Sequence, residues 1–318
     1  MSELDRQRVV FAEGEEPRII AAAAQLRQKH KIDCLLVGAS HAIEETALSH
    51  AIPIDGLRPI SPSDPILASQ CAEHVQALRQ FKSLSMAERL VKKPLPFAAA
   101  VVAIGEADLM VGGATSPTKR VIEAAAMCMG YANEEGSASS YFLMEIPGRE
   151  HSLLFADCAV NVEPSAAELA SIAVTTAHQA QALLGQPARV AMLSFSTQGS
   201  ASHASIDKVK QALELARQLD PNLLIDGEMQ VDTALSERVA ATKWQGNSEV
   251  AGRANVLIFP SLEAGNIGYK LVQQLTGAKA IGPMLQGFKH SIADLSRGAT
   301  VDEIVEVTRL ALRTKNAD

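Results

Sequence analysis

The sequence predicts an α/β protein of two domains, each a mostly parallel sheet flanked by helices. Short apolar runs that end in glycine alternate with amphipathic segments along the chain, as in strand–helix–strand units. Hydrophobic residues make up 47% of the chain but aromatic residues only 4%, so the core must be aliphatic. At 318 residues the chain exceeds the usual size of a single domain. Ligands are expected at the carboxyl ends of the strands.

The first half of the chain alternates strands and helices up to about residue 140. Glycine and proline in residues 13–17 end the first strand, and Pro117 marks the start of a helix. We expect strands or extended segments at 8–12, 34–38, 59–62 and 109–113, and helices at 18–30, 42–50, 66–79, 85–90, 97–104 and 116–127.

A second series follows. Ser165 and Glu168 have the spacing of a capping box, which starts a helix that runs to Leu184. We expect strands at 139–145, 153–160, 189–193, 223–227, 255–259 and 280–283, and further helices at 205–218, 233–241, 264–275 and 302–312. Because no long polar linker occurs, the domain boundary near residue 140 must be a tight crossover, and the final helix could pack on either half.

Composition excludes several classes of function. A formal net charge of −7 argues against a nucleic-acid-binding surface. The chain has no apolar run of membrane-spanning length and no apolar signal core, and its four cysteines include no CxxC pair, so a reducing cytoplasm is expected. There is no Walker loop, GxGxxG, GxSxG or His/Cys metal spacing.

Three segments are candidates for binding chemistry. Residues 194–202 follow a strand and are rich in hydroxyls, which suits phosphate or pantetheine amides. Residues 260–270 carry two glycines inside a helix, which indicates either close approach of a ligand or tight helix–sheet packing. Ser296, Arg297 and Gly298 precede a helix with carboxylates in its first turn, where an anion could bind and a proton could be removed. A surface turn remains the alternative for the first and third segments.

Taken together, these segments resemble the phosphotransacetylase family, also called phosphate acetyl/butyryltransferases. The resemblance covers nearly the whole chain, is strong from about residue 140 onward and is looser before it. The matching runs are RVAMLSFST at 189–197, DGEMQ at 226–230, ANVLIFP at 254–260, LEAGNIGYK at 262–270, AIGP at 280–283 with Gln286 and Gly287, and DLSRG at 294–298.

The resemblance implies a fold like that of isocitrate and isopropylmalate dehydrogenases, with an active-site cleft between the domains. Residues 1–140 plus 285–318 would form the first domain and 141–284 the second. The implied reaction is reversible transfer of an acetyl group between coenzyme A and inorganic phosphate in a ternary complex. Coenzyme A is then a substrate, no cofactor or metal is needed, and the chain is expected to form a homodimer without nucleic-acid or membrane partners.

The resemblance also implies roles for individual residues. Ser296 would donate a hydrogen bond to the acyl carbonyl, and Arg297 would neutralise developing charge. Glu303 falls at the family's general base, with Asp302 as the adjacent alternative. The residues implied for substrate or phosphate binding are Arg79, Thr118, Lys119, Arg120, Ser194, Ser196, Thr197, Gly265, Asn266 and Tyr269.

One position departs from the family pattern. Glu123 stands where the acetyltransferases carry a phosphate-binding arginine, and Lys119 or Arg120, about one turn nearer the helix start, could supply that charge. Residues 117–119 resemble the butyryltransferase branch instead. An acetyltransferase is expected, with a butyryl or propionyl transferase or a non-catalytic acyl-CoA-sensing domain as alternatives. A dehydrogenase on the same fold would need clustered metal-binding aspartates, which the sequence does not show.

Overall fold

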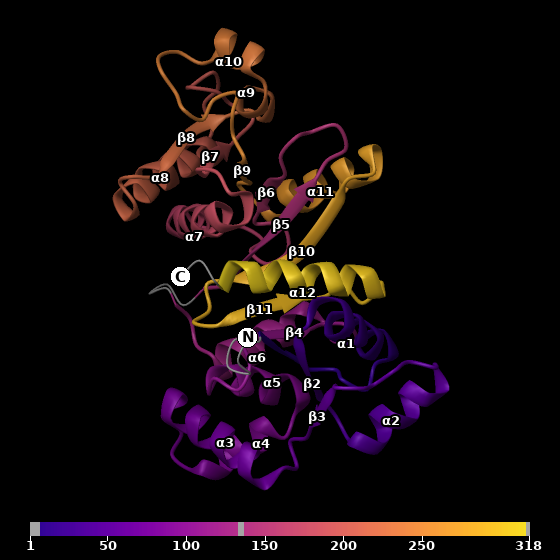
Figure 1. The fold of residues 1–318 in the computed structure, drawn as a ribbon. Coiled ribbons are helices and arrows are strands. Elements are labelled where there is room, and N and C mark those ends of the chain that lie inside the picture. The colour runs from indigo at the N-terminus through magenta and orange to yellow at the C-terminus, as the bar shows by residue number, and fades with distance from the viewer. Residues whose placement is uncertain (1–6, 133–136, 316–318) are drawn as a thin grey trace. The chain divides into compact units, whose positions relative to one another are not determined.

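The computed structural model describes residues 7–132 and 137–315 (Figure 1). These divide into two compact units, one formed by residues 7–132 with 288–315 and the other by residues 137–287. The expected boundaries at residues 140 and 285 fall a few residues from these. The C-terminal helix belongs to the first unit, so the chain leaves this unit and returns to it.

The described strands of the first unit form a parallel sheet in the order β3-β2-β1-β4-β11. Since all of them run the same way, their carboxyl ends lie at one edge. Their bounds are β1 Arg8–Phe11, β2 Asp33–Val37, β3 Arg58–Ile60, β4 Leu109–Gly112 and β11 Ser291–Asp294.

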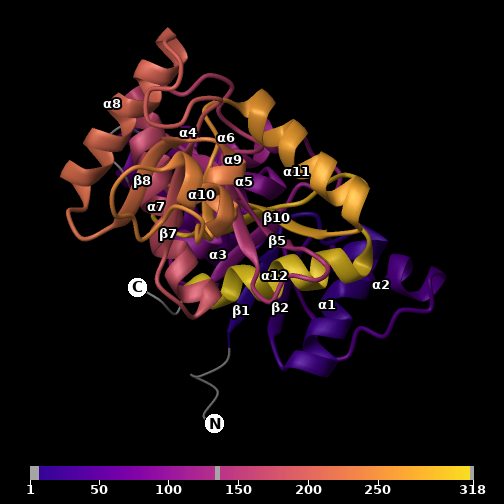
Figure 2. The same cartoon turned by 90° about the horizontal axis from the view of Figure 1, so that it is seen from above.

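Helices cover this sheet in two groups. α1 (Pro17–His30) packs against α12 (Val301–Lys315), and the two lie side by side in both Figure 1 and Figure 2. α5 (Pro94–Ala103) packs against α3, α4 and α6, and it is buried along most of its length because its side chains are almost all apolar. The remaining helices are α2 Ser40–Ser49, α3 Pro65–Arg79, α4 Leu84–Val91 and α6 Thr118–Cys128.

In the second unit the described strands have the order β10-β5-β6-β9-β7-β8. β5 is antiparallel to both of its neighbours, and the other pairs are parallel. The strands are β5 Ser139–Glu145, β6 Leu153–Ala156, β7 Arg189–Leu193, β8 Leu224–Met229, β9 Val256–Ile258 and β10 Lys279–Gln286. The helices are α7 Ala166–Leu184, α8 Ala204–Leu219, α9 Val231–Leu235, α10 Glu237–Lys243 and α11 Leu262–Thr276.

Local hydrogen bonds explain which helices and strands expected from the sequence are confirmed and which have other bounds. The capping box of Ser165 and Glu168 is confirmed at the start of α7. The single helix expected at 233–241 is wrong, because Ser236 is extended and its hydroxyl caps α10 by accepting from the Val239 N–H. The second strand of the β5–β6 pair stops at Ala156 rather than at Val160, because the Asp157 carboxylate turns the backbone by accepting three of the next N–H groups.

Candidate active site

The Ser296–Arg297 turn connects β11 to α12 in the first unit. The Ala299 N–H donates to the Ser296 carbonyl at 2.9 Å, and the Gly298 N–H donates to the Ser296 hydroxyl at 3.3 Å. These bonds close the chain into a tight turn, while the side chains of Ser296 and Arg297 remain exposed. A hydroxyl and a guanidinium are therefore presented to solvent at the carboxyl end of a parallel strand.

Arg18 of α1 holds this turn in place. Its Nη1 donates to the carbonyls of Arg297 and Ala299, both at 2.9 Å, and its Nη2 donates to the Ala114 carbonyl at 3.1 Å. Its Nε donates to Glu16 at 2.6 Å. The guanidinium thus joins the turn after β11 to the turn after β4. Sequence reasoning missed Arg18, because contacts across almost the whole chain leave no local pattern.

Glu303 caps the start of α12, a structural role in addition to the catalytic role expected of it. Its Oε2 accepts from the Thr300 N–H at 2.8 Å and from the Thr300 hydroxyl at 3.1 Å. The Thr300 hydroxyl in turn accepts from the Glu303 N–H at 3.3 Å. This reciprocal pair is a capping box at the start of α12, and the Thr-x-x-Glu spacing in the sequence could have revealed it. The Glu303 side chain is exposed, and its role as a base stays a prediction.

Asp294, the last residue of β11, is a buried acid beneath the Ser296–Arg297 turn. Its Oδ2 lies 2.5 Å from the hydroxyl of Thr118, the first residue of α6. Burial, with a further contribution from the negative charge of Glu13, raises the pKa of the Asp294 carboxyl to about 7. Thr118 is half-buried, so Asp294 links one predicted binding residue to the turn that carries two others.

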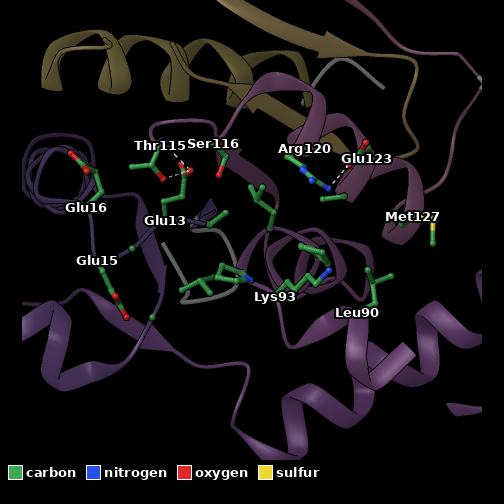
Figure 3. A pocket seen from close by; sticks show the side chains of 18 of the residues that line it. Glu13, Glu15, Glu16, Leu90, Lys93, Thr115, Ser116, Arg120, Glu123 and Met127 are labelled. Carbon is green, nitrogen blue, oxygen red and sulfur yellow. Dashed lines mark hydrogen bonds and ion pairs between the residues drawn. The ribbon is translucent and has the colours of Figure 1, made fainter. Parts of the chain in front are cut away.

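A cavity of about 940 Å³ opens in the first unit at the carboxyl ends of β1 and β2 (Figure 3). Leu90 and Lys93 lie on one side of it, and the turn after β4 and the start of α6 lie on the opposite side. Of the predicted site residues, Arg120 is among the described residues that line it. Arg120 forms an ion pair with Glu123 at 3.1 Å, and both side chains are exposed.

Glu13 shapes the β4 side of this cavity. Its carboxylate accepts from the Ala114 N–H at 2.7 Å, the Thr115 N–H at 3.0 Å and the Thr115 hydroxyl at 2.7 Å, as the dashed lines in Figure 3 show in part. Glu15 accepts from the Ala39 N–H at 2.9 Å. These hydrogen bonds fix the two carboxylates in place, and both keep a negative charge on this side of the cavity.

In the second unit, a buried carboxylate organises the hydroxyl-rich loop after β7. Glu228 is 2% exposed, and its Oε1 accepts from the Ser196 hydroxyl at 2.8 Å and the Gly199 N–H at 2.7 Å. The Thr197 hydroxyl is also buried and accepts from the Gln230 N–H at 3.0 Å. Ser196 and Thr197 therefore support the loop, and its accessible part is Ser194 with residues 198–200 and Phe195, which is 59% exposed.

The residues expected at the start of α11 contact the turn after β6. A Cβ on Gly265 would lie 2.3 Å from the Asp157 carbonyl oxygen, so this glycine permits close helix–strand packing. The Asn266 amide donates to the Cys158 carbonyl at 3.0 Å, and Tyr269 stacks on Phe142 with ring centroids 4.3 Å apart. Of the two readings of the glycines in this helix, packing accounts for Gly265.

The predicted site residues thus fall into separate groups. In the first unit, Thr118 is linked through Asp294 to the turn of Ser296 and Arg297, whereas Arg79 is an exposed residue at the end of α3 and Lys119 an exposed residue of α6. The described residues include no group of three or more metal-ligating side chains. Across the same residues, every helix is too short or too polar to cross a membrane.

Comparison with known proteins places this arrangement in a family. A family profile described as phosphate acetyl/butaryl transferase matches residues 2–312. A phosphate acetyltransferase from Clostridium acetobutylicum is 42% identical over 314 residues, which cover 97% of this chain and 94% of the relative. One from Thermoanaerobacterium thermosaccharolyticum is 44% identical over 309 residues, covering 95% of this chain and 93% of the relative.

Solved structures agree. A phosphotransacetylase from Streptococcus pyogenes has a TM-score of 0.90 at 34% identity and covers 98% of this chain and 94% of its own. A putative 4-hydroxythreonine-4-phosphate dehydrogenase from Salmonella typhimurium has a TM-score of 0.57 at 10% identity, covers 97% of this chain and 99% of its own, and shares the fold. The chain belongs to the phosphate acetyl/butaryl transferase family, as its sequence motifs indicated.

Proposed function

We propose that this protein is a phosphate acetyltransferase, which moves an acetyl group reversibly between coenzyme A and inorganic phosphate. The observation that carries the proposal is the exposed Ser296–Arg297 turn, anchored by Arg18 and followed by the exposed carboxylate of Glu303. Relatives that are 36–44% identical over nearly the full chain carry the name phosphate acetyltransferase. This chain therefore has the hydroxyl, the guanidinium and the carboxylate that the proposed acyl transfer requires.

In the proposed mechanism, Glu303 removes the proton of the coenzyme A thiol, whose pKa as a free thiol is about 8.5. The thiolate attacks the carbonyl carbon of acetyl phosphate, so that the S–C bond forms and the C–O bond to phosphate breaks. Ser296 donates a hydrogen bond to the carbonyl oxygen as charge develops on it, and Arg297 neutralises charge on that oxygen and on the leaving phosphate. The proton on Glu303 then passes to solvent or to the released phosphate.

Phosphate binding is assigned to Thr118, Lys119 and Arg120 at the start of α6, with Arg79 as a further cation. The N-terminus of α6 favours an anion, because no side chain caps its first N–H groups. Glu123 opposes this, but an exposed ion pair of the kind it forms with Arg120 is weak. Arg120 can therefore exchange Glu123 for a bound phosphate at little energetic cost.

Coenzyme A binding is assigned to the second unit. The accessible Ser194 and the residues around Phe195 offer a hydroxyl, backbone groups and an aromatic face, which suit the amides, phosphates and base of this substrate. Ser196 and Thr197 hold the loop in shape from beneath. Gly265 and Asn266 position the turn after β6 next to α11, and Tyr269 packs the same helix on Phe142 of β5. In this proposal coenzyme A is a substrate, and no resident cofactor takes part.

The proposal includes an assembly and a location. Ile267, Leu271 and Leu275 are 58%, 54% and 80% exposed and recur every four residues, so they form one apolar stripe along α11. We propose that a second copy of the chain covers this stripe in a homodimer. The four cysteines are free and buried, which supports a cytoplasmic location.

The test is to mix the protein with coenzyme A and acetyl phosphate and to follow thioester absorbance. A phosphate acetyltransferase forms acetyl-CoA and uses acetyl phosphate in preference to propionyl and butyryl phosphate. Faster reaction with butyryl phosphate would assign the longer acyl group. If no thioester forms but the protein binds acetyl-CoA tightly, the proposal fails. The protein would then be a non-catalytic acyl-CoA sensor, the alternative that Glu123 in place of a phosphate-binding arginine suggests.

A further inference from the structure

The carboxyl group of Asp294 is incompletely hydrogen-bonded in a closed environment. The residue is 1% exposed, and within the described part of the chain its Oδ1 accepts no hydrogen bond. Gly113 lies close to this oxygen, since a Cβ at position 113 would be only 2.3 Å from it. The Leu295 N–H donates to the Gly112 carbonyl at 2.8 Å, and it also stabilises the ionised Asp294 carboxyl and so lowers its pKa, though less than burial raises it. Thr118 is thus the side chain that meets this carboxyl group.

Such a group favours its neutral form. An ionised Asp294 would bury a negative charge with one bare oxygen, which is costly away from water. Glu13 adds repulsion, and the guanidinium of Arg18 is committed to backbone carbonyls. The charged groups on the elements around Asp294 include Glu13, Glu15 and Glu16 in the turn after β1, Arg18 on α1, Lys119, Arg120 and Glu123 on α6, Arg297 in the following turn, and Asp302, Glu303, Glu306, Arg309 and Arg313 on α12.

The protonation of Asp294 determines what the Thr118 hydroxyl can do. A hydroxyl has one proton to donate and two lone pairs to accept with. When Asp294 is ionised, it accepts the only proton of Thr118. When Asp294 is neutral, its own O–H can donate to Thr118 Oγ1 across the same 2.5 Å contact, and the proton of Thr118 is released to another acceptor. Thr118 is half-buried at the first position of α6, where that acceptor can be a bound anion.

We propose that Asp294 is a positioning residue for acyl phosphate binding, an inference that rests on the proposed function. As a neutral acid it donates to Thr118 Oγ1 and turns the Thr118 hydroxyl into a donor toward the phosphoryl group of the substrate. Its pKa of about 7 means that this donor would be lost as the pH rises through neutrality. The affinity for acyl phosphate is then set by a residue that never touches it.

The experiment measures KM for acetyl phosphate at saturating coenzyme A between about pH 6 and about pH 8.5, a range in which acetyl phosphate itself does not titrate. We expect the wild-type KM to rise roughly 30-fold over this range as the neutral form of Asp294 is depleted. In Asp294→Asn the amide N–H donates at every pH, so KM should stay nearly constant while kcat keeps the pH dependence of the wild type. In Thr118→Val, KM should be high and constant.

A rise of KM in Asp294→Asn parallel to that of the wild type would overturn the proposal, and so would a rise that persists in Thr118→Val. Difference infrared spectroscopy gives a readout that does not need activity. The wild type, but not Asp294→Asn, should show a carboxylic acid band at pH 6 that disappears with a midpoint of about 7. Absence of this band contradicts the proposal, whereas absence of thioester formation with the band present contradicts only the proposed function.

Discussion

Arg297 is the residue on which transition-state charge stabilisation is expected to depend most. Arg297→Ala should lower the rate of thioester formation by roughly 100-fold or more, as for loss of other preorganised donors. Thermal stability should change little, because the backbone carbonyl of Arg297, which Arg18 binds, is retained. Arg309→Ala, at an exposed arginine of α12, is the matched control. Equal rates for the two variants would remove Arg297 from the mechanism.

Gly265 should be intolerant of substitution for reasons of packing. In Gly265→Ala the new Cβ would meet the backbone oxygen of Asp157, so we expect the free energy of unfolding to fall by roughly 1–3 kcal/mol, as for other overpacked sites. Gly298→Ala is the control, because the nearest atom to its added Cβ, the Ser296 hydroxyl oxygen, is 3.9 Å away. Chemical denaturation of both variants measures the difference. If Gly265→Ala is as stable as Gly298→Ala, close approach of helix and strand does not explain this glycine.

At the scale of single residues, the sequence identified chemical types better than partners. The Ser296–Arg297 pair could be singled out because its neighbours in the chain also form its turn. Arg18 and Asp294 could not, since what defines each is contact with segments about 100 or more residues away. Ser196 and Thr197 were expected to meet substrate, but both are buried, with Ser196 bonded to Glu228 of β8 and Thr197 to Gln230 directly after that strand.

Among the elements, the loop after β7 depends on Glu228. Removing this carboxylate in Glu228→Ala leaves the Ser196 hydroxyl and the Gly199 N–H without their acceptor, which typically costs about 1–3 kcal/mol. We expect KM for coenzyme A to rise about tenfold with little change in kcat, since the loop is assigned to binding. Steady-state kinetics with varied coenzyme A measure this. The control Glu214→Ala removes an exposed carboxylate of α8, and an equal KM in both variants would contradict the assignment.

Most elements were predictable because their hydrophobic periodicity is local. The exceptions have causes that this periodicity does not show. Ser236 interrupts a helical pattern by capping the next helix with its own hydroxyl. β11, a strand of four residues with serine and aspartate at its ends, was not predicted, because its pairing with β4 is what makes it a strand. The Thr300–Glu303 capping box has a local sequence signature, Thr-x-x-Glu, and its glutamate also stands at the position expected for the general base.

At the scale of the whole molecule, the stripe on α11 predicts the oligomeric state. Leu271→Asp places a charge in the middle of the stripe and should convert a homodimer into a monomer. Leu48→Asp, at a leucine of α2 that is 84% exposed, should remain dimeric. Analytical ultracentrifugation distinguishes the two. A dimeric Leu271→Asp protein, or a monomeric wild type, would show that this stripe is not the interface.

The most direct test of acyl transfer at the α12 turn is the rate of thioester formation by Glu303→Gln. Glutamine can preserve the capping box with Thr300 but cannot take a proton from the thiol, so structure and chemistry are separated in one variant. We expect an unchanged melting temperature and a rate reduced by roughly 100-fold or more, while Asp302→Asn, one residue away and also exposed, keeps a rate close to that of the wild type. A Glu303→Gln enzyme that forms acetyl-CoA as fast as Asp302→Asn would contradict the proposed mechanism.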